Sequence, residues 1–176
     1  MQETDSDMAG EAAGPRRPYA DLTPDCVLDA VESLGFVVDG RLLPLNSYEN
    51  RVYQVGLDDT APVIAKFYRP GRWSDEAIAE EHAFMLALSE REIPAVAPLV
   101  IDGHSLHRHR GYRFSLTPRC GGRDPELEQP ETLIRIGRFI ARIHAVGASQ
   151  PFRHRPTLTR HHFGVEPSQY LIEQGW

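Results

Sequence analysis

Lys66 is the residue on which a chemical interpretation of this sequence depends. It is the only lysine among the 19 Lys and Arg residues of the chain, and it lies inside the apolar run 63–68. An ammonium group is a compact point charge on a flexible stem, whereas a guanidinium group is a broad planar fork. A lysine kept in a chain that otherwise uses arginine therefore suggests a contact with a phosphate oxygen, shared with one carboxylate. The alternative is a lone lysine on the solvated face of a strand.

A predicted helix offers the carboxylate partner. Ser74 is a good N-cap residue, and the sequence after it predicts a helix over about residues 75–90. The apolar positions on one side of this helix are Ile78, Met85 and Leu88. Glu81 falls on that same side, whereas Glu80 is rotated by ~100° and is expected to point to solvent. We therefore predict that Glu81 pairs with Lys66; the alternative is a tolerated polar residue at a helix edge.

The elements that must position these two residues follow from turn signals and hydrophobic periodicity. A helix is expected to begin at Thr23, and strands are expected at residues 41–45, 51–57, 63–68, 99–101 and 112–117. Asp102-Gly103 predicts a hairpin turn. A second long helix is expected from Glu131 to about Val146, ended by Gly147, and another begins near residue 169. This order predicts an α+β fold with a mostly antiparallel sheet.

Composition and charge limit the classes of function. The chain has 176 residues, 41% of them hydrophobic, so it can build the core of one ordinary domain. The net charge of −6 argues against a nucleic-acid binder. Cys26 and Cys120 lie far apart and no apolar run reaches ~18 residues, so we expect a cytoplasmic protein without a membrane segment.

The charge is unevenly distributed along the chain. Residues 1–103 hold 8 Lys and Arg against 19 Asp and Glu, whereas residues 104–162 hold 11 Arg against 4 acidic residues. The second segment is either an anion-binding half or a half whose acidic partners are missing. The histidine-rich stretches are His104, His107 and His109, and His154, His161 and His162. They lack paired acids or cysteines, so we interpret them as solvated loop residues and predict no metal site.

Several stretches together resemble one known family. They are residues 43–54, 66–73, 80–82, 94–98, 121–123 and 137–144. In them the chain resembles the amino-terminal part of the stress response kinase A family, bacterial Ser/Thr protein kinases with an aminoglycoside phosphotransferase and choline kinase-like fold. The resemblance implies a protein-kinase-like small lobe, made of an antiparallel sheet plus one helix, followed by a hinge and the first helices of a truncated large lobe. The expected divisions are a disordered leader over residues 1–19, the small lobe over 20–117, the hinge over 118–123 and the incomplete large lobe over 124–176.

The resemblance also implies an ATP site. Lys66 would hold the α- and β-phosphates and pair with Glu81. Asn46 and Ser47 lie in the loop that would cover the phosphates, with Ser47 offering its hydroxyl and backbone N–H; an ordinary hairpin turn is the alternative for this loop. At the hinge, the carbonyl of Pro118 and the N–H of Cys120 would contact the adenine edge. The apolar residues expected to line the purine pocket are Val52, Ala65 and Leu116.

Phosphoryl transfer needs further residues that this sequence does not offer after the hinge. A catalytic Asp accepts the substrate proton, and an Asn and an Asp hold Mg²⁺. The last aspartate here is Asp124 and the only asparagines are Asn46 and Asn50. We therefore expect a kinase truncated after Trp176, inactive alone, with its Mg²⁺ ligands in the missing part. Alone, it is expected to expose an apolar helix stripe and to aggregate; the stripe is Leu133, Ile136, Ile140 and Ile143.

Three functional hypotheses remain at this point. In the first, the full-length protein is a monomeric kinase that transfers phosphate from ATP to Ser/Thr hydroxyls of a protein substrate in a stress response. In the second, the acceptor is a small molecule of the aminoglycoside, choline or homoserine type. In the third, the chain is a non-catalytic nucleotide-binding module.

Overall fold

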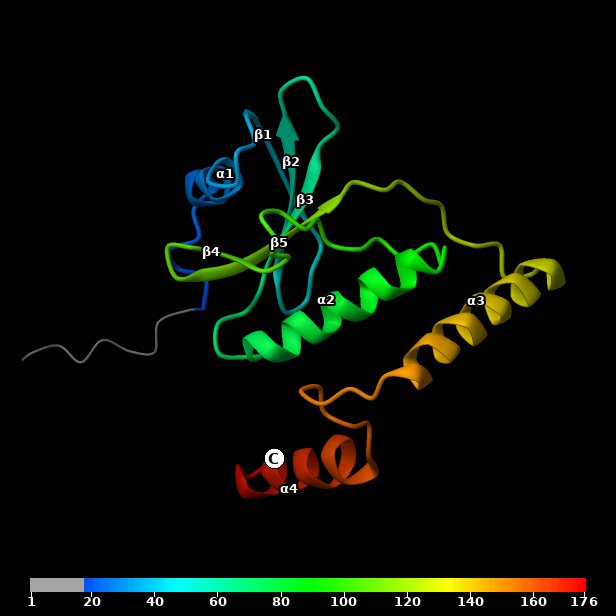
Figure 1. The fold of residues 1–176 in the computed structure, drawn as a ribbon. Helices are drawn as coiled ribbons and strands as arrows, with labels where there is room; N and C mark the ends of the chain where they lie inside the picture. Colours follow the sequence, from blue (N-terminus) through cyan, green and yellow to red (C-terminus); the bar gives the residue numbers. More distant parts are fainter. Residues whose placement is uncertain (1–17) are drawn as a thin grey trace, which may run out of the picture.

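The computed structural model describes residues 18–176; most of the expected leader, residues 1–17, lies outside the described residues. A five-stranded antiparallel sheet with the strand order β1-β2-β3-β5-β4 forms the centre of the fold (Figure 1). The strands are β1 (Val38–Leu45), β2 (Arg51–Leu57), β3 (Val63–Phe67), β4 (His107–His109) and β5 (Tyr112–Pro118). The helices are α1 (Pro24–Glu32), α2 (Asp75–Glu90), α3 (Pro130–Ser149) and α4 (Glu166–Glu173), and a π-helical turn, η1 (His161–Val165), precedes α4. The predicted α+β class with an antiparallel sheet is confirmed.

Helix α1 covers one face of the sheet. Thr23 Oγ1 accepts a hydrogen bond from the Cys26 N–H at 3.2 Å, so the helix begins where its capping residue predicts. The main core lies between α1 and the sheet; its fully buried members include Val27, Ala30, Val31, Val55, Ala65, Phe67, Phe114 and Leu116. Tyr19 packs against this core and donates its hydroxyl to the Glu49 carbonyl at 3.0 Å. Tyr19, expected in the leader, is therefore packed against the folded core.

Strand β3 presents alternate residues to the two faces of the sheet. Val63, Ala65 and Phe67 are buried in the α1 core, so Ile64 and Lys66 point to the opposite face. Lys66 is paired with a β2 residue on one side and a β5 residue on the other, because β3 lies between those strands. Helix α2 crosses this second face (Figure 1).

Helix α2 spans the predicted residues and is fixed at its first turn. Ser74 Oγ accepts a hydrogen bond from the Ala77 N–H at 3.2 Å. Arg113 in β5 reaches Asp75 at 2.8 Å, and Arg108 in β4 contacts the same carboxylate. These guanidinium groups, Arg113 first, lower the pKa of Asp75. The start of α2 is therefore tied to the β4–β5 hairpin.

The strand predictions between α2 and β5 are partly wrong. Residues 99–101 form no strand; the Leu99 N–H bonds to the Leu116 carbonyl at 2.8 Å, and Ile101 makes only an isolated bridge. Pro98, directly before this segment, has no backbone N–H with which to extend the pairing. Strand β4 was not predicted because its sequence, His-Arg-His, has no apolar residue. The turn at Asp102-Gly103 is confirmed, with φ values of 50° and 78°.

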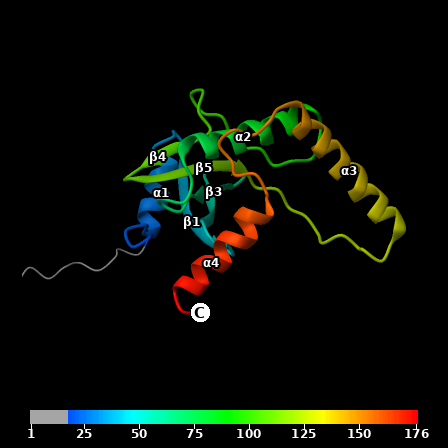
Figure 2. The same ribbon diagram turned by 90° about the horizontal axis from the view of Figure 1, so that it is seen from below.

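Residues 119–176, which we call the arm, leave the sheet and carry α3 and α4 (Figure 2). A second apolar cluster joins the end of α3 to the end of α2; its buried members are Leu88, Ile93 and Val146. Val146 is the only buried residue of the arm. Gly147 does not end α3, which continues to Ser149, because the ring of Phe84 packs beside it.

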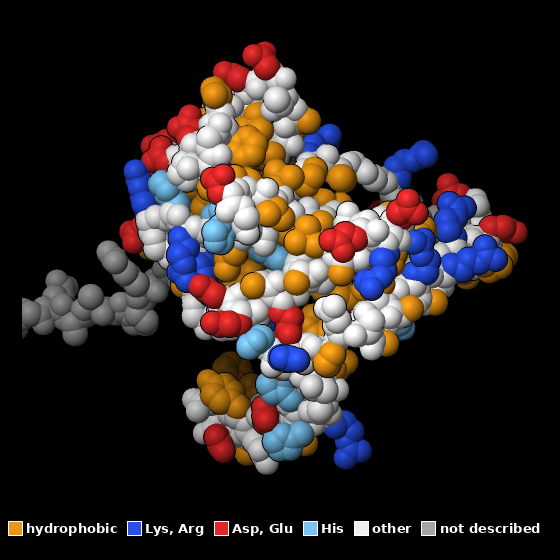
Figure 3. All heavy atoms as spheres, in the orientation of Figure 1, with side chains coloured by type: hydrophobic (Ala, Val, Ile, Leu, Met, Phe, Trp, Pro, Cys, Tyr) orange, Lys and Arg blue, Asp and Glu red, His pale blue; other side chains and the backbone are white. Residues whose placement is uncertain are grey.

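The apolar stripe of α3 is largely uncovered. Leu133 is 53% exposed and Ile140 is 46% exposed, as the sequence predicted, whereas Ile136 and Ile143 are half-buried. In Figure 3, hydrophobic side chains follow the lower margin of α3 and basic side chains cover its upper side. Within residues 18–176, no helix combines the length and apolarity that crossing a membrane requires.

Candidate functional site

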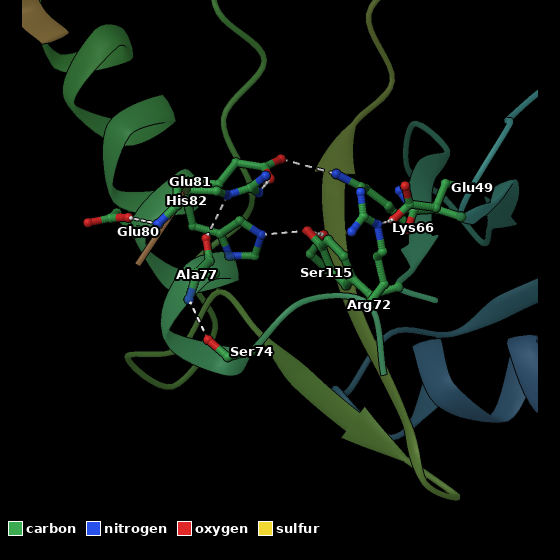
Figure 4. A network of polar contacts seen from close by, with 12 residues as sticks. Glu49, Lys66, Arg72, Ser74, Ala77, Glu80, Glu81, His82 and Ser115 are labelled. Atoms are coloured by element: carbon green, nitrogen blue, oxygen red, sulfur yellow. Dashed lines mark hydrogen bonds and ion pairs between the residues drawn. The ribbon is translucent and has the colours of Figure 1, made fainter. Parts of the chain in front are cut away.

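Lys66 and Glu81 meet where α2 crosses the second face of the sheet. Lys66 Nζ lies 3.1 Å from Glu81 Oε1 (Figure 4). The helix turns Glu81 toward the sheet because Ile78, one turn earlier, is fully buried beneath it. The Lys66 and Glu81 side chains remain 30% and 34% exposed, so the ammonium group is accessible to an anion. The predicted pairing is present, and an ion pair this exposed contributes little to stability, which favours a positioning role.

A buried polar network lies behind Lys66. The Tyr68 hydroxyl is 2.7 Å from His82 Nε2 and 3.1 Å from Ser115 Oγ, and His82 Nδ1 is 2.9 Å from Ser105 Oγ. Lys66 Nζ lies 4.7 Å from the centroid of the Tyr68 ring. Burial, helped by the charge of Lys66, lowers the pKa of His82 to about 4, so its ring is neutral at pH 7. Sequence reasoning missed this network.

The loop between β1 and β2, residues 46–50, is held by contacts on both sides. The Ser47 hydroxyl donates to the Asn50 carbonyl at 2.7 Å, which leaves the Ser47 hydroxyl engaged inside the loop. Glu49 lies 3.3 Å from Arg72, so the loop is tied to the segment after β3. Asn46 and Tyr48 are exposed. This arrangement is an ordered hairpin loop next to the end of β3, the strand that carries Lys66.

The residues expected to line a purine pocket divide between the two faces of the sheet. Val52 lies directly opposite Lys66 and shares its face. Ala65 and Leu116 are a correction, because they pair with each other and are fully buried in the α1 core. Adjacent strand residues point to opposite faces, so the residues that share the Lys66 face lie two positions away. These are Ile64 in β3 and its partner in β5, Thr117.

Strand β5 extends one residue further than predicted, into the segment expected to be a hinge. Pro118 is the last residue of β5 and pairs with Val63. Pro118 and Cys120 are both exposed, and residues 119–126 have no regular secondary structure. In the described part of the chain, no hydrogen bond engages the Cys120 N–H.

Glu80 does not point to solvent as predicted. It points away from Lys66, on the other side of α2 (Figure 4), but its carboxylate accepts three backbone hydrogen bonds from residues 153–155, at 2.6, 3.0 and 3.0 Å. Burial opposes its ionisation, and these N–H groups outweigh that effect and lower the pKa of Glu80. The guanidinium of Arg155 contacts Glu81 Oε2, and its Nε donates to the Ala77 carbonyl at 3.0 Å. Sequence reasoning missed Arg155, because nothing local in the arm marks it.

Several arginines of the segment 104–162 form ion pairs with acidic residues of the first half of the chain. Arg108 and Arg113 contact Asp75, and Arg110 lies 2.8 Å from Asp29. Arg155 contacts Glu81. For these residues, the interpretation that acidic partners are missing is therefore wrong.

The histidine-rich stretches have mixed environments. His107 and His109 lie in β4 and are half-buried, which corrects their assignment to a solvated loop. His161 and His162 in η1 are exposed, and each lies 3.0 Å from Glu166. Among residues 18–176, no group of three His, Cys, Asp or Glu side chains is arranged to hold a metal ion.

Comparison with known sequences gives two results. The model of the phosphotransferase enzyme family matches residues 41–174. Stress response kinase A of Escherichia coli O157:H7 is 42% identical over 149 residues, and the serine/threonine protein kinase RdoA of Salmonella typhimurium is 41% identical over 151 residues. These alignments cover 85% and 86% of this chain but 45% and 46% of the relatives. The chain thus spans about half the length of the curated relatives it matches.

Comparison with solved structures shows the same type of fold. Amicoumacin kinase hAmiN, solved with AMP-PNP, Ca²⁺ and Ami, has a TM-score of 0.62 at 16% identity, covering 82% of this chain and 49% of that protein. The microcompartment-associated aminopropanol kinase has a TM-score of 0.56 at 20% identity, covering 81% and 48%. The likeness confirms the predicted kinase-like small lobe with the first helices of a large lobe.

Proposed function

Because this chain belongs to the phosphotransferase enzyme family, we propose that it is the ATP-binding part of a kinase of the stress response kinase A type. The observation that carries the proposal is the Lys66–Glu81 pair, at 3.1 Å and accessible from outside. In this role Lys66 binds the α- and β-phosphates, and Glu81 holds the ammonium group in place.

The rest of the proposed nucleotide site follows from the face that Lys66 shares. Val52, Ile64 and Thr117 lie on this face and would contact the purine, in place of the expected Ala65 and Leu116. The Pro118 carbonyl and the Cys120 N–H would contact the adenine edge at the hinge. Above the phosphates, the backbone of Asn46 and Ser47 would provide N–H groups, since the Ser47 hydroxyl already donates to Asn50.

The residues of this chain do not fit the Mg²⁺ ion that such kinases use. The described residues contain no cluster of metal-ligating side chains, and no Asp or Asn follows Asp124 in the sequence. We therefore propose that this chain binds ATP without transferring its γ-phosphate. Catalysis would belong to a protein of the relatives' full length, acting as a cytoplasmic monomer in a stress response.

For the acceptor of that full-length protein, we propose Ser and Thr hydroxyls of proteins. The support is the name of a relative with 41% identity, a serine/threonine protein kinase. A small-molecule acceptor is the second candidate, supported by the amicoumacin and aminopropanol kinases at 16% and 20% identity. The higher identity favours the protein acceptor.

Thermal unfolding with and without ATP tests nucleotide binding by this chain. We expect ATP to raise the unfolding temperature of the wild type, because a ligand that binds only the folded state stabilises it. Lys66→Ala should reduce this shift to the size that adenosine produces. Arg41→Ala, which removes an exposed cation paired with Asp39 in β1, is the matched control and should keep the shift. No shift with wild type, or an equal shift with Lys66→Ala, would contradict the proposal.

A chimera tests the acceptor. This chain would replace the matched 149 residues of stress response kinase A of E. coli, and the chimera would be incubated with γ-labelled ATP. We expect label on Ser and Thr of an added protein and none on an aminoglycoside. Label on the aminoglycoside alone would favour the second candidate.

A further inference from the structure

Residues 153–155, which we call the strap, bind helix α2 through two neighbouring carboxylates. The three consecutive N–H groups of the strap converge on Glu80 at 2.6 to 3.0 Å. Arg155 then reaches past Glu80 and contacts Glu81. In Figure 1 the chain between α3 and α4 passes beneath α2, so a segment more than 70 residues away in sequence is fastened to the helix.

The Arg155 side chain is held on all sides. Its Nε donates to the Ala77 carbonyl at 3.0 Å, its terminal nitrogen contacts Glu81, and its guanidinium lies 4.3 Å from the Trp73 ring centroid. Only 23% of the side chain is exposed. A planar guanidinium stacked on an aromatic ring and bonded at both edges has one orientation, so it can fix the carboxylate that it contacts.

Glu81 is consequently shared between two cations. Oε1 faces Lys66 and Oε2 faces Arg155, so the cluster holds two positive charges and one negative charge. Without Arg155, the charge of Lys66 would be balanced by Glu81 alone. Glu80 adds little to this balance, because it points away from Lys66 and three N–H dipoles offset its charge (Figure 4).

We propose that Arg155 is a positioning residue of the phosphate site. The strap holds α2 against β3, and Arg155 contacts one of the two carboxylate oxygens of Glu81. Glu81 therefore neutralises Lys66 only in part, and the ammonium group keeps a net positive charge toward phosphate. The proposal rests on the proposed ATP-binding function and deepens it. It assigns a role in phosphate binding to a residue between α3 and α4, whereas the other residues proposed to contact phosphate lie on β3, on α2 and in the loop between β1 and β2.

Titration of the 176-residue chain with ATP and with adenosine, followed by NMR, tests this role. The variants are Arg155→Gln, which removes the charge, and Arg155→Lys, which keeps it. Arg153→Gln is the matched control, because it changes an arginine of the same strap whose backbone N–H, and not its side chain, contacts Glu80. We expect Arg155→Gln to weaken ATP binding by about tenfold and to leave adenosine binding unchanged. Arg155→Lys should recover part of the loss, and Arg153→Gln should bind as the wild type does.

The outcomes separate this proposal from the proposed function. Wild-type binding of ATP that is lost in Lys66→Ala but unchanged in Arg155→Gln would overturn the role of Arg155 alone. Equal losses for ATP and adenosine, or equal losses in Arg155→Lys and Arg155→Gln, would show that the strap only supports the fold, and would also overturn it. If Arg155→Gln does not fold, Arg155→Lys carries the test, with weakened ATP binding and unchanged adenosine binding as the expected result. Failure of the wild type to bind ATP would overturn the proposed function and this inference together.

Discussion

Two regions of the molecule differ in how far their side chains are buried. One is the sheet with α1 and α2, residues 18–118, and the other is the arm, residues 119–176. The first region encloses an apolar core between α1 and the sheet and a polar network behind Lys66. In the arm, Val146 is the only buried residue, and α3 leaves Leu133 and Ile140 about half exposed. The arm is fastened to the first region through the end of α3 and through the strap.

This difference shows that an amphipathic pattern can predict a helix without showing that its apolar side is covered. The stripe of α3 is regular and apolar, and it predicts a helix correctly, but little in this chain covers it. Helix α2 carries a carboxylate on its inward side, and that exception to the pattern marks the contact with Lys66. The apolar pattern of α3 therefore marks a largely exposed helix side, whereas the charged exception in α2 marks a contact with the sheet.

Substitution of a phenylalanine in each region should show the largest difference. Phe114 is fully buried and stacks on Phe67 with ring centroids 5.2 Å apart, whereas Phe163 in η1 is 57% exposed. Phe114→Ala should lower the free energy of unfolding by about 3–5 kcal/mol because it leaves a cavity. Phe163→Ala should change it by less than about 0.5 kcal/mol. Urea denaturation measures both, and equal losses would show that the arm is as tightly packed as the sheet.

Acid should destabilise the first region through His82. Its folded pKa of about 4 lies below the ordinary value of 6.5, so the unfolded chain binds the proton more readily. The titration of His82 should leave the free energy of unfolding unchanged above about pH 6.5. As the pH is lowered from there toward 4, it should reduce the free energy of unfolding by up to about 3 kcal/mol. Some of the pH dependence remains without His82, because burial also lowers the pKa of His107.

The measurement is urea denaturation at several pH values, for the wild type and for His82→Gln. The variant should show a shallower decrease below pH 6.5. His161→Gln, at an exposed site in η1, should follow the wild type. A decrease of the same steepness in His82→Gln and in wild type would contradict the assignment.

Helix capping should differ between the regions by a smaller amount. Ser74 caps α2 with a hydrogen bond to the Ala77 N–H, whereas Gln129 at the start of α3 makes no such bond. Ser74→Ala should lower the free energy of unfolding by about 1 kcal/mol, and Gln129→Ala should leave it nearly unchanged. The same denaturation measurement checks both, and a loss in Gln129→Ala as large as that in Ser74→Ala would argue against it.

Polar substitutions on the exposed stripe should have the smallest effect on stability and a visible effect on association. Leu133→Gln with Ile140→Gln should change the free energy of unfolding by less than about 0.5 kcal/mol each. Because an uncovered apolar stripe promotes association, light scattering should show less aggregation in this double variant than in the wild type. A wild type that stays monodisperse at all concentrations would contradict this expectation.

Much of the fold could be predicted because its signals are local. Thr23 and Ser74 cap their helices as expected, and the Asp102-Gly103 turn forms where its φ > 0 residues predict. Strand β4 could not be predicted, since His-Arg-His carries no hydrophobic alternation and pairs only because β5 lies beside it. The end of α3 was missed because packing against Phe84 outweighs the tendency of Gly147 to stop a helix.

The residues of the candidate site could be predicted only where helical or strand periodicity alone determines which way a side chain points. The position of Glu81 follows from helical spacing, and its contact with Lys66 is present. Ala65 lies on the face opposite to the predicted pocket because side chains alternate along β3; Ile64, two residues before Lys66, shares the lysine's face. The role of Arg155 depends on a contact across 74 residues of sequence, which no local pattern encodes.

Binding of ATP compared with adenosine tests the central claim, that Lys66 and Glu81 form a phosphate site. Isothermal titration of the wild type should give tighter binding of ATP than of adenosine, because only ATP reaches the ammonium group 3.1 Å from Glu81. In Lys66→Ala the two affinities should become equal, with adenosine binding retained. A preference for ATP that persists in Lys66→Ala would contradict the claim.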